Sequence, residues 1–254
     1  MKAVRGTLIK NKIAIEKMRT AGKRLACILQ DIGPEVVAGI STLDLDRIVE
    51  DKMRKSGLVP ECKGYAGYKH ATCISLNDGI VHGIPSKDLI LKSGDFVKID
   101  VVGSYKSYCA DMTRFFFVGD VSIVTRKIAQ TAQDALDAAI GKIAPGVRVS
   151  EISACIQDKV EFDGFSIIRA FAGHGIGKDL HEDPDIPNYR KAGDDVVLRE
   201  GMTLAIEPMI SERSHEVRIL QDGWTAKTAD GGLAAHVEDT VLVVKNGSEV
   251  LTRI

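Results

Sequence analysis

Apolar residues recur at helical spacing in two stretches near the start of the chain. The first pattern runs over residues 15–32 and is interrupted by Pro34. The second runs over residues 42–53 and stops at Gly57, a residue type that commonly follows the end of a helix. Between residues 68 and 118 the apolar runs are shorter and are bounded by turn residues, which is typical of strands. The pattern therefore predicts two helices followed by a sheet.

The second half of the chain repeats this order. Apolar residues at helical spacing fill residues 128–143 and 152–160, and Pro145 separates the two patterns. A basic residue, a glycine and a mostly apolar strand-like run follow in residues 198–207. We expect a second pair of helices, followed by a second turn that leads into a strand of a sheet.

Two pairs of segments match at one constant offset. Residues 198–207 (LREGMTLAIE) echo residues 91–100 (LKSGDFVKID), and the offset is 198 − 91 = 107. Residues 146–152 echo residues 39–45 at the same offset. Two matches in the same helix-helix-strand order indicate an internal duplication.

The duplication predicts the fold class. No low-complexity tract or linker rich in Pro, Gly or Ser separates the halves. We therefore expect one α+β domain over residues 1–254, with an antiparallel sheet and flanking helices. Its two similar halves would cover approximately residues 13–120 and 121–254.

Two aspartates lie in neighbouring strand-like runs that flank a plausible hairpin loop at residues 103–107. If the turn centres between Tyr105 and Lys106, facing residue numbers sum to 211, and Asp100 lies opposite Asp111. Like charges at facing positions destabilise a sheet, so a shared proton or bound cations must offset the repulsion. The alternative is a register shifted by one residue, which turns one aspartate toward solvent.

Glu207 and Glu238 lie in comparable settings, because each is embedded in an apolar strand pattern. Carboxylates are rarely buried without partners, and the repulsion among four of them would cost several kcal/mol. Two divalent ions would nearly balance the four charges. The acids of both halves therefore indicate a metal centre.

Three histidines lie in suggestive contexts. His174 is in the glycine-dense run 173–177, His181 precedes an acidic pair, and His82 precedes a glycine. Imidazole is a common ligand for catalytic metals and transfers protons near neutral pH. Each taken alone also fits an ordinary turn or core histidine. We assign that ordinary role to His70, His215 and His236.

Composition and charge exclude several classes of protein. The net charge of −1 gives no basis for binding nucleic acid or an anionic membrane, and no apolar run approaches the ~20 residues of a membrane span. Residues 1–12 are basic but lack the apolar core of a signal peptide. The five cysteines are odd in number and form no C-x-x-C pair, which favours a reducing, cytoplasmic compartment.

Read together, these motifs resemble the methionine aminopeptidase family, and the type I short form without an N-terminal extension fits best. The resemblance runs from about Ile15 to Leu251 and includes residues 77–85 and 222–225. The family has the pita-bread fold, in which two similar halves surround a dinuclear metal site. The motifs that carry the resemblance are Asp100, Asp111, residues 173–177, residues 181–184, residues 206–208 and Glu238.

The resemblance implies a ligand for each position of the metal centre. Asp100 would bind one ion, Asp111 and Glu238 would bridge both, and His174 with Glu207 would complete the second ion's sphere. One nitrogen among many oxygens suits cobalt, manganese, iron or zinc.

The resemblance also implies a monovalent cation at the carbonyls near Asn77 and Ala234. The family pattern has Gln where His236 stands and His where Asp239 stands. Both departures flank Glu238, so we expect them to alter metal affinity or the groups that support the ligands.

By resemblance, the activity is removal of the initiator methionine from nascent proteins and peptides whose second residue is small. Glu207 would pass protons, His181 would stabilise the oxyanion, and His82 would contact the substrate amide. We expect a cytoplasmic monomer that acts on nascent N-termini and binds neither nucleic acid nor membrane. The expected walls of the methionine pocket are Cys62, Tyr65, Tyr68, Cys73, Leu180 and Trp224.

Two alternatives stay open from the sequence. A proline-directed aminopeptidase or dipeptidase of the same fold usually carries a large extra domain, which 254 residues cannot hold. A non-catalytic pita-bread protein that binds protein or RNA would lose metal ligands, whereas all five are present here.

Overall fold

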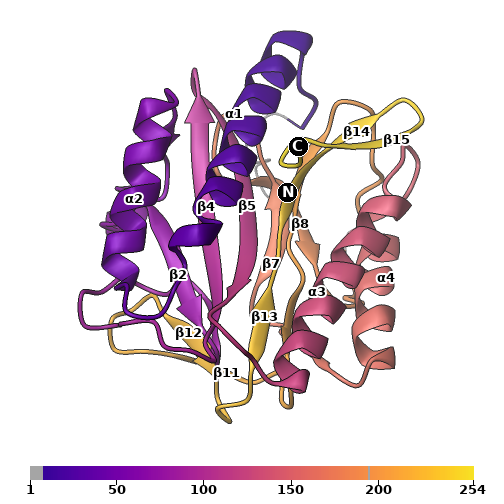
Figure 1. Cartoon of the computed structure of the whole chain (residues 1–254). Coiled ribbons are helices and arrows are strands. Elements are labelled where there is room, and N and C mark those ends of the chain that lie inside the picture. Colours follow the sequence, from indigo (N-terminus) through magenta and orange to yellow (C-terminus); the bar gives the residue numbers. More distant parts are fainter. Residues whose placement is uncertain (1–7, 194) are drawn as a thin grey trace.

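Two pairs of helices lie over the strands, one pair on each half of the molecule (Figure 1). The computed structural model describes residues 8–193 and 195–254, so most of the basic stretch 1–12 lies outside the described residues. All four helices predicted from apolar periodicity are confirmed. They are α1 (Lys12–Asp31), α2 (Thr42–Lys55), α3 (Ile123–Lys142) and α4 (Val149–Phe162), and short 3-10 turns occur at Gly33–Glu35 and Tyr65–Gly67.

Antiparallel strands fill the space beside the helices. The strands of the first half are β1 (Val59–Pro60), β2 (Thr72–Leu76), β3 (Gly79–Val81), β4 (Phe96–Tyr105) and β5 (Tyr108–Phe117). Those that follow are β6 (Ser166–Ile167), β7 (Ala172–Gly175), β8 (Glu182–Pro187), β9 (Thr203–Ile206), β10 (Met209–Ser211), β11 (Val217–Ile219), β12 (Ala226–Thr228), β13 (Ala234–His236), β14 (Asp239–Val244) and β15 (Gly247–Val250).

Each half has its own sheet. In the first half β4 pairs with β1, β2 and β5, and in the second half the order is β15-β14-β9-β7-β8. Two smaller sheets have the orders β13-β10-β6 and β11-β12-β3, and the latter joins a first-half strand to the second half. The predicted α+β class with duplicated halves is confirmed.

The offset of 107 found in the sequence recurs in the backbone. Helix α4 begins and ends 107 residues after α2 (149 − 42 and 162 − 55), and β9 begins 107 residues after β4 (203 − 96). Hydrogen bonds repeat as well. Gly39 N donates to Leu91 O at 2.9 Å, and Gly146 N donates to Leu198 O at 2.9 Å. Both glycines have positive φ (98° and 92°), a conformation that costs glycine little.

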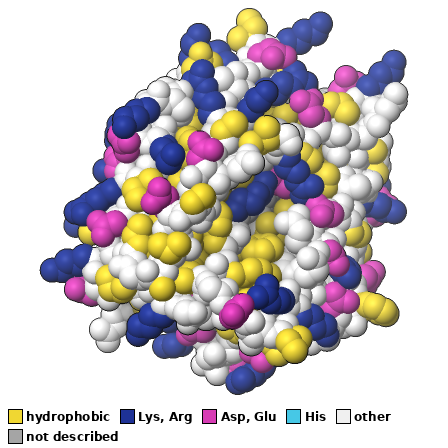
Figure 2. Space-filling model, in the orientation of Figure 1, with side chains coloured by type: hydrophobic (Ala, Val, Ile, Leu, Met, Phe, Trp, Pro, Cys, Tyr) yellow, Lys and Arg dark blue, Asp and Glu magenta, His cyan; other side chains and the backbone are white. Residues whose placement is uncertain are grey.

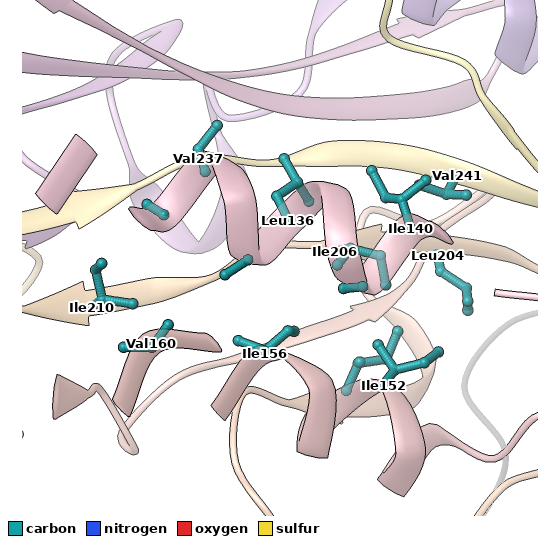
Figure 3. Packing of buried hydrophobic residues seen from close by; sticks show 14 of the residues in the cluster. Leu136, Ile140, Ile152, Ile156, Val160, Leu204, Ile206, Ile210, Val237 and Val241 are labelled. Carbon is teal, nitrogen blue, oxygen red and sulfur yellow. The ribbon is translucent and has the colours of Figure 1, made fainter. Parts of the chain in front are cut away.

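The core of the second half fixes the position of β9. Leu136 of α3 and Ile156 of α4 belong to the same buried cluster as Leu204 and Ile206 of β9 (Figure 3). All four side chains are fully buried, and each such burial contributes about 1.5–3 kcal/mol. Because Glu207 directly follows Ile206, this packing holds the carboxylate at the end of a rigid strand.

The register of the β4–β5 hairpin corrects one expectation. Asp100 faces Thr113, and Val102 faces Asp111, so facing numbers sum to 213 and not to 211. The turn is formed by Lys106 and Ser107, both at positive φ, as in the two-residue turns that match strand twist. The shift of two residues preserves the face, so the two aspartates are diagonal neighbours on one side of the sheet.

Gly103 explains why the turn was predicted too early. It lies within β4 and not in the loop. A Cβ atom there would lie 3.0 Å from Leu25 Cδ2 and 3.1 Å from Met53 Cε, so the glycine permits close helix packing on the strand. Its role is in packing and not in the turn.

Candidate metal centre and substrate cavity

One cavity of about 150 Å³ collects every predicted site residue. It lies between the two halves, because its lining residues come from strands of both. Val102 is the one lining residue that was not predicted. The residues that line it are Cys62, Tyr65, Tyr68, Cys73, His82, Asp100, Val102, Asp111, His174, Leu180, His181, Glu207, Trp224 and Glu238.

The face that carries the helices shows basic, acidic and apolar side chains interspersed, and no histidine of the described residues is visible on it (Figure 2).

Strand pairing between the halves brings the carboxylates together. Thr113 of β5 exchanges two backbone hydrogen bonds with Glu238 (3.3 and 3.2 Å), and Thr113 Oγ1 donates to the Glu238 carboxylate at 3.2 Å. The neighbouring Asp111 N donates to Thr240 Oγ1 at 2.8 Å, and that hydroxyl donates back to Asp111 O. The end of β13 and the start of β14 are thereby fixed to the strand that carries Asp111.

The Nε2 atom of His174 lies close to two acids. Its Nδ1 donates to the carbonyl of Gly175 at 2.9 Å, which leaves the lone pair of Nε2 directed at the carboxylates. Nε2 lies 3.8 Å from Asp111 Oδ2 and 3.6 Å from Glu207 Oε1. Two ligands of one ion, each ~2.1 Å from it, lie roughly 3–4 Å apart. The spacing suits a metal ion between these atoms.

The acids of the cavity have abnormal pKa values. Burial raises the pKa of Asp100 to about 6, and the same cause raises those of Asp111, Glu207 and Glu238 well above their ordinary range. Repulsion by Asp100 raises the pKa of Asp111 further. The ionised form of these carboxyl groups is therefore unfavourable here unless a cation compensates their charge.

Orphaned polar atoms support the fit of divalent ions. Oδ1 of Asp100, Oδ1 of Asp111 and Oε1 of Glu238 are buried and have no hydrogen-bond partner among the described residues. Buried polar atoms without partners are rare because each costs ~1–3 kcal/mol. Oxygen donors of this kind, with imidazole beside them, are suitable ligands for first-row divalent metals.

His236 belongs to the same centre, although we assigned it the role of an ordinary histidine from the sequence. It is buried, and its Nε2 lies 3.6 Å from Glu207 Oε2 and 3.9 Å from Glu238 Oε2. Burial lowers its pKa to about 4, which keeps the imidazole neutral near pH 7. Its position two residues before Glu238 was the available signal, because alternate residues of an extended chain share a face.

The other departure from the family pattern has a different role. Asp239 is fully buried, and it accepts hydrogen bonds from Arg114 Nη2 at 2.6 Å and from Arg253 Nε at 2.7 Å. Thr252 donates a further bond to the same carboxylate. Asp239 therefore anchors the C-terminal residues and does not belong to either group of candidate metal ligands among the described residues.

The predicted monovalent cation site is occupied by a side chain of the protein itself. Lys98 is fully buried, and its Nζ donates to the carbonyls of Asn77 at 3.0 Å and of Ala234 at 2.9 Å. These are the carbonyls that we expected to hold the ion, so the expectation is corrected. Burial lowers the pKa of Lys98 to about 7.

Apolar and sulfur-bearing side chains also line the cavity. Tyr68 and Trp224 meet edge to face with centroids 5.0 Å apart, and the Tyr68 hydroxyl donates to Thr72 O at 2.9 Å. Cys62 and Cys73 are buried free thiols, and a hydrogen bond with Cys73 together with burial raises the pKa of Cys62. The Cys62 thiol therefore remains protonated and brings no charge to the cavity.

His181 and His82 both line the cavity. The ring of His181 is 4.4 Å from that of His174, and its Nδ1 is 2.8 Å from the Tyr65 hydroxyl. His82 adopts positive φ (58°), and burial lowers its pKa to about 4. The His82 ring is therefore neutral near pH 7 and can exchange a hydrogen bond without bringing a charge.

The fold and this buried centre are those of a metallopeptidase, and residues 16–245 match metallopeptidase family M24, to which the chain belongs. Its place within the family is among the methionine aminopeptidases. It is 42% identical over 245 residues to a methionine aminopeptidase of Escherichia coli (strain K12), covering 96% of this chain and 93% of that protein. The family and the buried ligand groups support the binding of divalent metal ions.

Solved structures agree with this assignment. A methionine aminopeptidase from Thermotoga maritima has a TM-score of 0.95 and 43% identity, covering 99% of this chain and all of that one. A prolidase from Pyrococcus furiosus shares the fold at a TM-score of 0.78 and 26% identity, but only 66% of its length is covered. The proline-directed alternative is therefore not favoured. No helix in residues 8–193 or 195–254 is both long and apolar enough to cross a bilayer.

Proposed function

We propose that this chain removes the N-terminal methionine from nascent proteins and peptides whose second residue is small. The observation that carries the proposal is that two kinds of side chain line one cavity. Four carboxylates and the imidazole of His174 form the first group, and thiols, apolar side chains and aromatic rings form the second. The first group supports metal-assisted hydrolysis, and the second supports recognition of a thioether.

The size of the cavity fits one side chain. A volume of about 150 Å³ equals that of engineered protein cavities that bind benzene. The methionine side chain has four heavy atoms and is smaller than benzene. Sulfur makes favourable contacts with aromatic rings, which Tyr68 and Trp224 supply. The cavity has no room for further residues N-terminal to the methionine. This limit would account for cleavage at the terminal residue only.

The ligand assignment proposed for the centre follows the family pattern. Asp100 would bind one ion, Asp111 and Glu238 would bridge two, and His174 with Glu207 would complete the second sphere. Cobalt, manganese, iron or zinc suits this donor set. When bound, such ions supply Lewis acidity that lowers the pKa of water and polarises the scissile carbonyl.

Three side chains would carry the remaining chemistry. Glu207, whose pKa is raised by burial, would take a proton from the attacking water and deliver it to the leaving amine. His181 would donate a hydrogen bond to the oxyanion, with its ring oriented by the Tyr65 hydroxyl. His82, which lines the same cavity, would contact the amide of the second residue.

The setting proposed for this activity is the cytoplasm, where nascent N-termini are available. We propose that the chain acts as a monomer and as one catalytic domain over residues 1–254, with halves at approximately 13–120 and 121–254. Each half would contribute acids to the centre, so neither would be active alone.

A peptide assay tests the proposal. Chelator-treated protein is supplied with Mn²⁺, Fe²⁺ or Co²⁺ and incubated with Met-Ala-Ser, its N-acetylated form and Gly-Pro. Release of methionine from Met-Ala-Ser alone is expected, because the free amine and the methionine side chain are both recognised. Cleavage of Gly-Pro, or no cleavage with any metal despite tight metal binding, would overturn the proposed function.

A further inference from the structure

Two groups of potential metal ligands meet at one carboxylate. Asp111, His174 and Glu238 form the first group, and Glu207, His236 and Glu238 form the second. Within each group the ligand atoms lie within 4.8 Å of one another. The centre therefore offers one imidazole to each of two positions that share Glu238, whereas the family pattern supplies one imidazole in all.

The imidazole of His236 is directed into the centre and has no other partner there. The residue is 2% exposed, and its Nε2 is buried without a hydrogen bond among the described residues. The distances of 3.6 Å to Glu207 and 3.9 Å to Glu238 are too long for hydrogen bonds. They match the spacing of atoms that share an ion.

The backbone holds His236 in this position. It is the last residue of β13 and pairs with Met209 of β10. Two residues earlier, the carbonyl of Ala234 accepts a hydrogen bond from the buried Lys98. Lys98 comes from the strand that carries Asp100, so this bond fixes β13 to the opposite half of the centre. These contacts fix the backbone of His236 beside the centre.

We propose that His236 is a sixth protein ligand of the metal centre, binding through Nε2 to the ion that does not contact His174. Glu207 would then contact both ions, because its Oε1 lies 3.6 Å from His174 Nε2 and its Oε2 lies 3.6 Å from His236 Nε2. The inference rests on the proposed metal-dependent function and deepens it. The donor set then contains two imidazoles with four carboxylates. Nitrogen ligands favour zinc, cobalt and iron, whereas all-oxygen sites favour manganese. The centre therefore prefers Co²⁺ over Mn²⁺ more strongly than a centre with one histidine.

Cobalt loading with proton NMR tests this ligand directly. Chelator-treated protein receives Co²⁺ up to saturation, and exchangeable imidazole N–H signals shifted by the paramagnetic ion are counted. Two such signals are expected for the unaltered protein and one for His236→Gln. His215→Gln is the matched control, because His215 is exposed and remote in sequence from the ligands, and it should keep both signals.

Affinity gives a second readout. Calorimetric titration with Co²⁺ should show one ion bound roughly 10–100-fold more weakly in His236→Gln, with a smaller change for Mn²⁺. Circular dichroism establishes that the variant is folded, and the count of signals in the unaltered protein does not depend on the variant. If the unaltered protein shows one signal and His236→Gln binds Co²⁺ with unchanged affinity, this inference is overturned. Methionine release that persists in the same samples would leave the proposed function standing. Absence of Co²⁺ binding in the unaltered protein overturns the proposed function as well.

Discussion

Replacing Asp111 with Asn should stabilise the metal-free protein and abolish its response to metal. The side chain is buried, and its carboxylate lies within 4.8 Å of that of Glu238. Burial raises the pKa of Asp111 well above its ordinary value of 3.8. The Asp111 carboxyl therefore keeps its proton to a higher pH in the folded protein than in the unfolded chain. Asparagine has nearly the same shape and carries no charge to be neutralised.

The sign and size of the effect follow from proton linkage. Because the pKa of Asp111 is higher in the folded protein than in the unfolded chain, its bound proton stabilises the folded protein fully below about pH 3.8. This stabilisation is lost as the pH rises toward the folded pKa. Relative to asparagine, the aspartate loses ~1.4 kcal/mol per pH unit over this window. The stabilisation by Asp111→Asn should thus be near zero around pH 4 and grow as the pH rises toward 7, by no more than this amount for each pH unit.

Urea unfolding in the presence of a chelator measures this difference. Trp224 is the single tryptophan and lies in the cavity wall, so its fluorescence reports on this region. Asp88→Asn, at an exposed loop position, is the control and should change stability by less than ~0.5 kcal/mol at every pH. With Co²⁺ at a hundredfold excess over Kd, the unaltered protein gains ~2.7 kcal/mol and the variant much less. If Asp111→Asn is less stable than the unaltered protein at pH 7 without metal, or is stabilised equally at all pH values, burial of the Asp111 charge does not destabilise the metal-free protein.

Three further changes have defined outcomes. Lys98→Met removes the ammonium that donates to the carbonyls of Asn77 and Ala234 and should lower the free energy of unfolding by ~1–3 kcal/mol, measured by thermal denaturation. Glu182→Gln weakens a buried ion pair with Lys10 (2.6 Å) and should cost ~3–5 kcal/mol in urea unfolding. His181→Ala should lower kcat on Met-Ala-Ser with little change in KM, and an unchanged kcat in steady-state kinetics would exclude its oxyanion role.

The helices and the duplication were predictable because their causes are local. Amphipathic periodicity identified α1 to α4, and a constant offset linked Leu91 with Leu198 before any contact was known. The acids of both halves interrupt apolar strands, and this pattern indicated that they converge. The assignment of roles to particular ligands came from the family resemblance and not from the pattern.

The features that were missed depend on contacts between distant segments. Gly103 looked like a turn residue, whereas packing of Leu25 and Met53 against β4 requires it there. His236 looked ordinary because its neighbour Glu207 lies on another strand. Lys98 alternates with Asp100 in the sequence, but only the fold places its ammonium on the carbonyl of Ala234. Such pairings cannot be inferred from local spacing.

Anomalous diffraction from crystals grown with Co²⁺ is the most direct test of the central claim. We expect two peaks in the cavity, both bordered by Asp111 and Glu238, with His174 beside one and His236 beside the other. Peaks elsewhere on the molecule with none between these carboxylates would contradict it.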